Sequence, residues 1–178
     1  MANVTFTFKG RQTHTVDDKG RLILPSQFRT VLAASREPST VYLGSYPGTK
    51  FVSVYPSERW DELCRDWKDE KRFPNTEAMQ DGQRLFFANI EQTPVDRTGR
   101  VTIPAHFRER ANLKDDVLVI GVAEKMEIWN PAELEAHELA LSREREERVK
   151  AAQAAAAAAA AAIAASGQMP EEVRLPSF

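Results

Sequence analysis

Residues 16–29 read VDDKGRLILPSQFR, and residues 95–108 read VDRTGRVTIPAHFR. The two segments align without a gap, and seven of the fourteen positions are identical. A repeat of this kind shows that one structural unit occurs twice in a chain, so it decides the fold before any single element does. The protein is therefore built from two homologous halves.

Each half predicts the same run of short elements. A strand leads into a polar turn that ends in Gly20 or Gly99, and glycine supplies the positive φ that a tight hairpin commonly needs. A returning strand follows, and the proline after it suits the start of a helix. We expect this helix to bury Phe28 in the first copy and Phe107 in the second. The expected elements are strands at 12–16, 21–24, 90–95 and 100–103, and helices at 26–32 and 105–111.

The remainder of each half is expected to form a β-hairpin and then a longer amphipathic helix. The hairpins are predicted at 40–43 with 50–55 and at 117–122 with 125–129, and the helices at 57–69 and 131–148. Between the halves, Arg72-Phe73-Pro74 should break the first long helix, and residues 76–88 should form another. The predicted organisation is a first module (1–60), a helical linker (61–89), a second module with its closing helix (90–142) and a tail (143–178).

The tail has low complexity. Residues 142–150 are a charged helical face, and residues 151–165 are alanine apart from Gln153 and Ile163. Alanine favours helix, yet an isolated alanine helix is only marginally stable in water. We expect a partly helical extension, and an amphipathic helix that binds a partner is the alternative.

Composition places the protein among cytoplasmic globular proteins. Of the 178 residues, 42% are hydrophobic and 28% are charged. No apolar run is long enough to cross a bilayer, and the first residues do not resemble a secretory signal. Cys64 is the single cysteine, which excludes an intrachain disulfide and a cysteine-rich zinc site.

Positive charge is concentrated in the two repeats, although the formal net charge is −2. Residues 9–29 contain five Lys/Arg against two aspartates, and residues 96–110 contain four Arg against two acidic residues. Phosphates respond to the local potential within about one Debye length, roughly 8–10 Å. The distribution therefore favours an anionic partner more than the net charge suggests.

An enzyme is not predicted. His14, His106 and His137 are far apart in the sequence and belong to no metal or nucleophile motif, and Cys64 is expected in the core. The isolated Gly20 and Gly99 do not form a phosphate-binding glycine loop. We expect no cofactor, metal ion or small-molecule substrate.

The repeats resemble the MraZ family of transcriptional regulators. The first signature comprises Phe8-Lys9-Gly10, residues 16–25 and Phe28-Arg29. The second comprises Asp96-Arg97-Thr98-Gly99-Arg100, Pro104 and Phe107-Arg108, with Glu127-Ile128-Trp129 after it. The resemblance covers about residues 4–142 and leaves out the alanine-rich tail.

This resemblance implies an α+β, β-rich fold with tandem AbrB-like swapped-hairpin β-barrel modules, short helices and a helical C-terminal extension. It also implies a homo-oligomer in the form of a closed ring that binds double-stranded DNA at short direct repeats in a promoter. Such a protein acts as a repressor of the division and cell-wall gene cluster, including its own promoter. We would then expect a nucleoid-associated protein.

The resemblance also assigns roles to residues of the D-x-x-x-R loops. The expected DNA-binding residues are Lys19, Arg21, Arg97 and Arg100, and the second loop should bind less strongly because Thr98 replaces a lysine. Lys9 and Arg11, on the first strand, are candidates for phosphate contact, whereas Arg29 and Arg108 are expected on the surface or in a structural salt bridge. Asp17, Gly20, Asp96 and Gly99 are expected to hold the loops.

Two alternatives remain open. Asp17 and Arg21 could pair only to hold the turn, or Asp17 could orient Arg21 toward DNA, and the same holds for Asp96 and Arg100. At the level of function, the alternative is a ring-forming scaffold for other proteins that has only non-specific DNA affinity.

Overall fold

The computed structural model describes residues 7–69, 71–72 and 76–166. By its internal contacts the chain divides into two compact units, Met1–Leu134 and Glu135–Phe178. Most of the predicted helix break at 72–74 and the end of the predicted tail lie outside the described residues, as do residues 1–6 of the predicted first module. The module boundaries derived from the sequence remain predictions.

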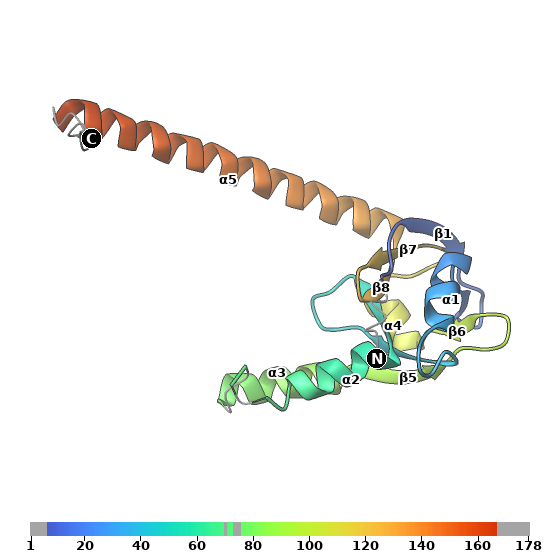
Figure 1. Cartoon of the computed structure of the whole chain (residues 1–178). Coiled ribbons are helices and arrows are strands. Elements are labelled where there is room, and N and C mark those ends of the chain that lie inside the picture. The colour runs from blue at the N-terminus through green and yellow to red at the C-terminus, as the bar shows by residue number, and fades with distance from the viewer. Residues whose placement is uncertain (1–6, 70, 73–75, 167–178) are drawn as a thin grey trace, which may run out of the picture. The chain divides into compact units, whose positions relative to one another are not determined.

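The two halves contain the same elements in the same order, as the repeat predicted (Figure 1). The first half consists of β1 (Arg11–Thr15), β2 (Arg21–Ile23), α1 (Ser26–Ala33), β3 (Thr40–Gly44), β4 (Phe51–Pro56) and α2 (Ser57–Asp66). The second consists of β5 (Ile90–Pro94), β6 (Arg100–Thr102), α4 (Ala105–Arg110), β7 (Asp116–Val122), β8 (Lys125–Trp129) and α5 (Pro131–Ser166). Between them lies α3 (Glu77–Phe87), with the Thr76 side chain accepting a hydrogen bond from the backbone N–H of Met79 at its start.

The strands pair between the halves. A six-stranded sheet has the order β1-β7-β8-β4-β3-β5, and β2 pairs with β6 in a second sheet. The predicted hairpins β3–β4 and β7–β8 are confirmed. The hairpin expected from the two strands around Gly20 is wrong, because β1 pairs with β7 and β2 pairs with β6. The tight turn is present, but the chain leaves it toward the other half after the single bridge between Val16 and Leu22.

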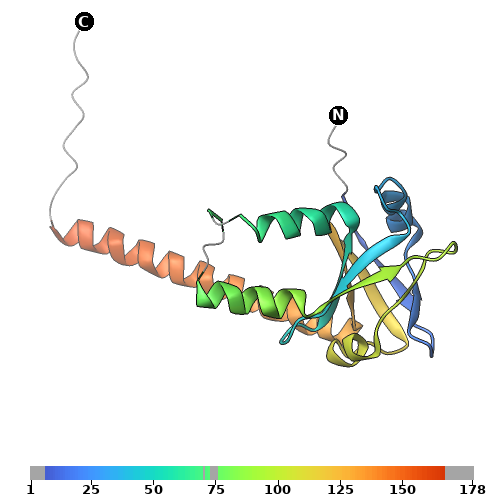
Figure 2. The same cartoon turned by 90° about the horizontal axis from the view of Figure 1, so that it is seen from below.

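The exchange of strands produces one shared core. Both edge strands of the large sheet, β1 and β5, lead into the two strands of the small sheet, and the elements form a barrel-like body (Figure 2). Phe28 and Phe107 are buried on α1 and α4, as predicted, and Phe8 meets Phe28 edge to face with 5.8 Å between ring centroids. The α+β, β-rich fold with a helical C-terminal extension is therefore confirmed, and the copies contribute jointly to its core.

The Glu127-Ile128-Trp129 motif of β8 lies in this body. Glu127 is buried, and its carboxylate accepts a hydrogen bond from Trp129 Nε1 at 2.9 Å and pairs with Lys125 Nζ at 2.7 Å. A buried carboxylate must be paired or hydrogen-bonded, because loss of its hydration is costly. The motif therefore supplies a carboxylate and one group that hydrogen-bonds to it, and Lys125, two residues earlier on β8, neutralises its charge.

Helices α2 and α3 carry an aromatic cluster outside the barrel core. Trp60 stacks on Tyr42 at 4.8 Å, Trp67 lies 5.5 Å from Phe86, and Phe86 meets Phe87 edge to face. None of the residues of α3 is fully buried, and Cys64 on α2 is half-buried. The prediction of Cys64 in the core is wrong, because Ser57 is the one residue of α2 that is buried and Cys64 stays partly exposed.

Helix α5 is longer than predicted and continues through the alanine tract to Ser166. Leu134 in its first turn is buried, whereas residues 135–163 are exposed. The helical extension expected from the alanine content is confirmed. Within the described part of the chain, no helix combines the length and apolar character required to cross a membrane.

Candidate nucleic-acid interface

The turn between β1 and β2 is organised by Asp17. Its Oδ1 atom accepts hydrogen bonds from the backbone N–H groups of Lys19 at 3.0 Å and Arg21 at 2.8 Å. Its Oδ2 atom accepts one from Arg21 Nε at 2.7 Å. Gly20, at φ +76°, closes the turn by donating to the Asp17 carbonyl. One carboxylate thus fixes both the backbone of the turn and the direction of the Arg21 side chain.

The turn between β5 and β6 repeats this geometry. Asp96 Oδ1 accepts from the backbone N–H groups of Thr98 at 2.8 Å and Arg100 at 2.9 Å, and Oδ2 accepts from Arg100 Nε at 2.8 Å. The Thr98 hydroxyl adds a hydrogen bond to Oδ1 at 2.7 Å. Gly99, at φ +81°, occupies the position of Gly20. The Asp–Arg pairs that the sequence left open are therefore formed in both turns.

These contacts favour the ionised aspartates. The pKa of Asp17 is lowered from its ordinary value, chiefly because the backbone N–H of Arg21 donates to the carboxylate. The pKa of Asp96 is lowered strongly, first by the Thr98 hydroxyl and then by the backbone N–H of Arg100. Hydrogen bonds to a carboxylate stabilise its charged form. Both turns consequently keep their geometry at neutral pH.

The two turns lie at the two ends of the short β2–β6 ribbon, because β2 and β6 are antiparallel and each turn precedes its own strand. Leu24 N–H donates to the Gly99 carbonyl at 2.9 Å, and Ile103 N–H donates to the Gly20 carbonyl at 2.8 Å. In Figure 2 the turns, coloured blue and yellow-green, lie at the end of the barrel away from α2 and α3. The glycine of each turn is thus bonded to the strand that follows the other turn.

Arg29 and Arg108 add further contacts between the two halves. Arg29 of the first copy lies against Gly99, and its Nη1 atom donates to the Thr98 carbonyl at 3.4 Å. Arg108 of the second copy lies against Gly20, and its Nε atom donates to the Ile103 carbonyl at 3.2 Å. Each arginine therefore supports the turn of the opposite half, and it brings positive charge close to that turn.

The β2–β6 ribbon has one inward and one outward face. Leu22 pairs with Val101, and both are buried. Because side chains alternate along a strand, the flanking residues share the other face. Arg21 lies opposite Thr102, and Ile23 lies opposite Arg100. The outward face therefore carries the arginines of both D-x-x-x-R turns at diagonal positions.

The other predicted cations occupy two places. Lys19 and Arg97 are exposed in the turns, and neither forms an ion pair with a residue that the structure describes. Lys9 and Arg11 lie at the opposite end of β1, where Arg11 pairs with Ile120. At 3.4 Å per residue, Arg11 is about 20 Å from Asp17 along the strand. The structure thus places Arg21 and Arg100 at diagonal positions of the ribbon, puts Lys19 and Arg97 in the turns at its two ends, and leaves Lys9 and Arg11 at the far end of β1.

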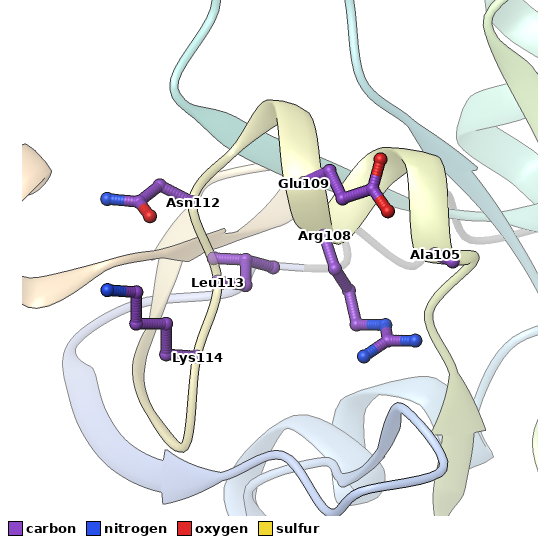
Figure 3. Close-up of a pocket in the computed structure, with 6 residues that line it drawn as sticks. All are labelled: Ala105, Arg108, Glu109, Asn112, Leu113 and Lys114. Atoms are coloured by element: carbon purple, nitrogen blue, oxygen red, sulfur yellow. The ribbon is translucent and has the colours of Figure 1, made fainter.

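A shallow hollow of about 190 Å³ lies next to α4 (Figure 3), and one of its lining residues is Arg108, which lies against Gly20. It is lined by Ala105, Arg108, Glu109, Asn112, Leu113 and Lys114. Asn112, at φ +51°, ends α4, where Leu113 N–H donates to the Arg108 carbonyl. Figure 3 shows Arg108 extending toward the pale blue ribbon of the first copy. The hollow therefore forms where α4 ends and where Arg108 of this helix extends toward the turn that contains Gly20.

The protein is therefore a tandem-repeat β-barrel protein, in which two D-x-x-x-R units share one barrel. The sequence model of the family described as "MraZ protein, putative antitoxin-like" matches residues 7–82 and 86–156. The chain belongs to the MraZ family.

Curated relatives agree over most of the chain. The "Transcriptional regulator MraZ" of Lachnoclostridium phytofermentans is 35% identical over 130 residues, which cover 73% of this chain and 86% of the relative. The protein of the same name from Heliobacterium modesticaldum is 37% identical over 124 residues, covering 69% and 80%. That of Ruegeria pomeroyi is 33% identical over 144 residues, covering 77% and 85%.

Sequence reasoning missed the contribution of the strands and helices around the turns. Arg29 contacts Thr98 and Gly99, which are 69 and 70 positions away, and Arg108 contacts Gly20, which is 88 positions away. No local pattern indicates these contacts. The exposed Ile23 had a visible signal, because the polar–apolar alternation of Arg21–Leu24 fails at this position, whereas Thr102 maintains it in the second copy.

Proposed function

We propose that the protein is a sequence-specific, DNA-binding transcriptional regulator that contacts double-stranded DNA through the outward face of the β2–β6 ribbon and its two turns. The observation that carries the proposal is the position of Arg21 and Arg100 on that face. Three relatives that share 33–37% of their aligned residues with this chain are named as transcriptional regulators. A two-stranded ribbon fits the major groove of DNA, which is about 12 Å wide.

The held arginines suit base recognition. Asp17 and Asp96 each accept a hydrogen bond from the Nε atom of their arginine, which leaves the terminal guanidinium nitrogens as donors for a base. A guanidinium can donate two parallel hydrogen bonds to guanine O6 and N7, and a fixed side chain loses less entropy on doing so. The aspartates thereby act as positioning residues, and the arginines as contact residues.

The distribution of charge also supports this face as the DNA-binding surface. Six basic side chains lie in or against the two turns, together with three aspartates: Lys19, Arg21, Arg29, Arg97, Arg100 and Arg108, with Asp17, Asp18 and Asp96. Phosphate contacts position a protein on DNA, while base contacts give it specificity. Lys19 and Arg97, at the exposed turns, are assigned to phosphate.

The proposal includes assembly, because one subunit offers few cations and a handful gives only weak binding. A closed ring of subunits presents several ribbons to successive direct repeats, and linked sites gain affinity by multivalency. Such a ring at the promoter of its own gene and of a division and cell-wall gene cluster acts as a repressor by covering the promoter. The protein then works in the cytoplasm, on the nucleoid.

The test is a gel shift with the region upstream of the protein's own gene. The wild type should retard the fragment, and the Arg21→Ala/Arg100→Ala double variant should lose most of the affinity. The slope of log K against log salt should fall by about two, one for each cation. The matched control is Arg143→Ala/Arg145→Ala, which removes two exposed arginines from α5 and should bind as the wild type does.

Three outcomes would count against parts of the proposal. Absence of wild-type binding to promoter fragments contradicts the regulatory function and favours a scaffold for proteins. Full binding by the double variant contradicts the assignment of the ribbon. Fragments with two, three and four repeats test assembly, and equal affinity for all three contradicts the ring on direct repeats.

A further inference from the structure

Ile23 is a large apolar side chain on the otherwise polar outward face of the β2–β6 ribbon. It is 47% exposed, lies two residues after Arg21 on the same strand and is directly opposite Arg100 on β6. Cβ atoms of directly opposed residues are roughly 4.5–5.5 Å apart. Ile23 is therefore a direct neighbour of both arginines that the proposed function assigns to DNA.

The fold does not require an apolar residue at this position. The inward face is already occupied by Leu22, which is completely buried, together with Val101. In the second copy the corresponding position is Thr102, which is exposed and polar. The two halves thus satisfy the same backbone geometry with different chemistry, and the difference lies on the outward face.

We propose that Ile23 contacts the C5 methyl group of a thymine and so determines part of the sequence preference. This inference rests on the proposed binding of the ribbon in the major groove. Among the four bases, only thymine presents an apolar group there. Successive bases along one strand are about 3.4 Å apart, so an apolar side chain next to a base-reading arginine reaches an adjacent base step.

The contact belongs to one half of the ribbon, because Thr102 takes the position of Ile23 in the other half. Arg21 and Arg100 present the same group on both sides of the local two-fold relation between the copies. Ile23 breaks that equivalence, because Thr102 occupies the symmetry-related corner of the face. The preferred thymine therefore lies on one side of the bases read by the arginines, and it fixes the direction in which a subunit sits on DNA.

The experiment uses duplexes that the wild-type full-length protein selects from a random pool of about 20 base pairs. Each thymine of the selected sequence is replaced singly by uracil, which differs only by the missing methyl group. At one position the wild type should lose about fourfold in affinity, the value of one buried methyl-sized group. Ile23→Ala should bind the thymine duplex less tightly and bind both duplexes equally, while Ile23→Val should retain most of the discrimination.

Val122→Ala is the control for removal of an exposed aliphatic side chain, because Val122 is 40% exposed on the distant β7–β8 hairpin. Selection of no sequence by the wild type contradicts the proposed function itself. Selection of a sequence without any uracil effect, or persistence of the uracil effect in Ile23→Ala, overturns the role of Ile23 alone. Equal affinities with a changed oligomeric state for Ile23→Ala on a sizing column also overturn it.

Discussion

The side chain of Arg29 lies across the backbone of Gly99, so closely that a methyl group added to Gly99 would be 2.1 Å from Arg29 Cδ. Arg29 belongs to the first copy and Gly99 to the turn of the second. The reciprocal contact places Arg108 over Gly20, where an added methyl group would be 2.7 Å from Arg108 Nε. Glycine at these two positions therefore serves the turn and also admits a side chain from the opposite half.

Gly99→Ala should destabilise the protein by about 2 kcal/mol, the sum of a strained positive φ and a displaced Arg29. The free energy of unfolding in urea measures the effect. Gly48→Ala is the matched control, since Gly48 has φ +84° but no atom within 4 Å of an added methyl group. It should cost only about 1 kcal/mol.

A variant of Arg29 can measure how much of this destabilisation comes from the overlap between Arg29 and the methyl group of an alanine at position 99. In an Arg29→Ala background, the cost of Gly99→Ala should fall to that of Gly48→Ala, because only the backbone strain remains. An unchanged cost in that background would show that the contact with Arg29 is energetically irrelevant.

Arg21→Lys should separate charge from geometry. Lysine keeps the positive charge but lacks the planar fork that donates to a carboxylate through Nε and to a base through its terminal nitrogens. Binding of a selected duplex by Arg21→Lys should therefore keep the salt slope of the wild type and lose discrimination between specific and random duplexes. Arg21→Ala should lose both, and equal discrimination by all three proteins would contradict base contact by Arg21.

Lys19 and Thr98 should account for unequal contributions of the two turns. Lys19→Thr removes one cation that we assign to phosphate and should reduce the salt slope by about one. Thr98→Lys adds a cation but removes the hydroxyl that donates to Asp96. It should raise affinity at low salt and lower the melting temperature slightly, and an increase in both quantities would be inconsistent with the structural role of the hydroxyl.

Asp96 should titrate below its ordinary pKa of 3.8. A depressed carboxyl pKa contributes stability that is complete above the ordinary value and disappears as the pH falls through the lower one. The two turns should therefore contribute fully at pH 5 and begin to weaken only below about 3.8.

Carboxyl carbon NMR measures this titration residue by residue. Thr98→Val removes the largest cause of the shift and should raise the midpoint of Asp96 toward 3.8. Asp17 has no contact with that hydroxyl and serves as the internal control. A midpoint for Asp96 that stays unchanged in Thr98→Val would assign the shift to the Arg100 contacts and the backbone N–H of residue 98.

The sequence predicted the elements well because their signals are local. Gly20 and Gly99 mark turns, Phe28 and Phe107 mark helix faces, and the repeat supports each assignment twice. The pairing partners of the strands are harder to predict from the sequence, since the pairing of Arg11 with Ile120 depends on contacts about one hundred residues apart. A turn sequence determines how the chain reverses, and it does not determine how long the two strands stay together.

The candidate site also has a part that could be predicted from the sequence and a part that depends on strand pairing. The D-x-x-x-R spacing indicated the Asp17–Arg21 and Asp96–Arg100 pairs, since residues four apart across a turn come close together. The meeting of both pairs on one ribbon depends on the pairing of β2 with β6. The support by Arg29 and Arg108 likewise follows from that pairing, and it is absent from any pattern within one copy.

The exchange of strands between the halves makes each chain equivalent to a covalently joined dimer. Two separate chains that shared their strands in this way would unfold on dilution, because the stability of an obligate dimer depends on its concentration. The connection through α2 and α3 keeps both halves at a high effective concentration. We expect the fold to be independent of abundance, so that even a few copies in a cell retain a complete β2–β6 ribbon, and its two halves are free to diverge as Lys19 and Thr98 have done.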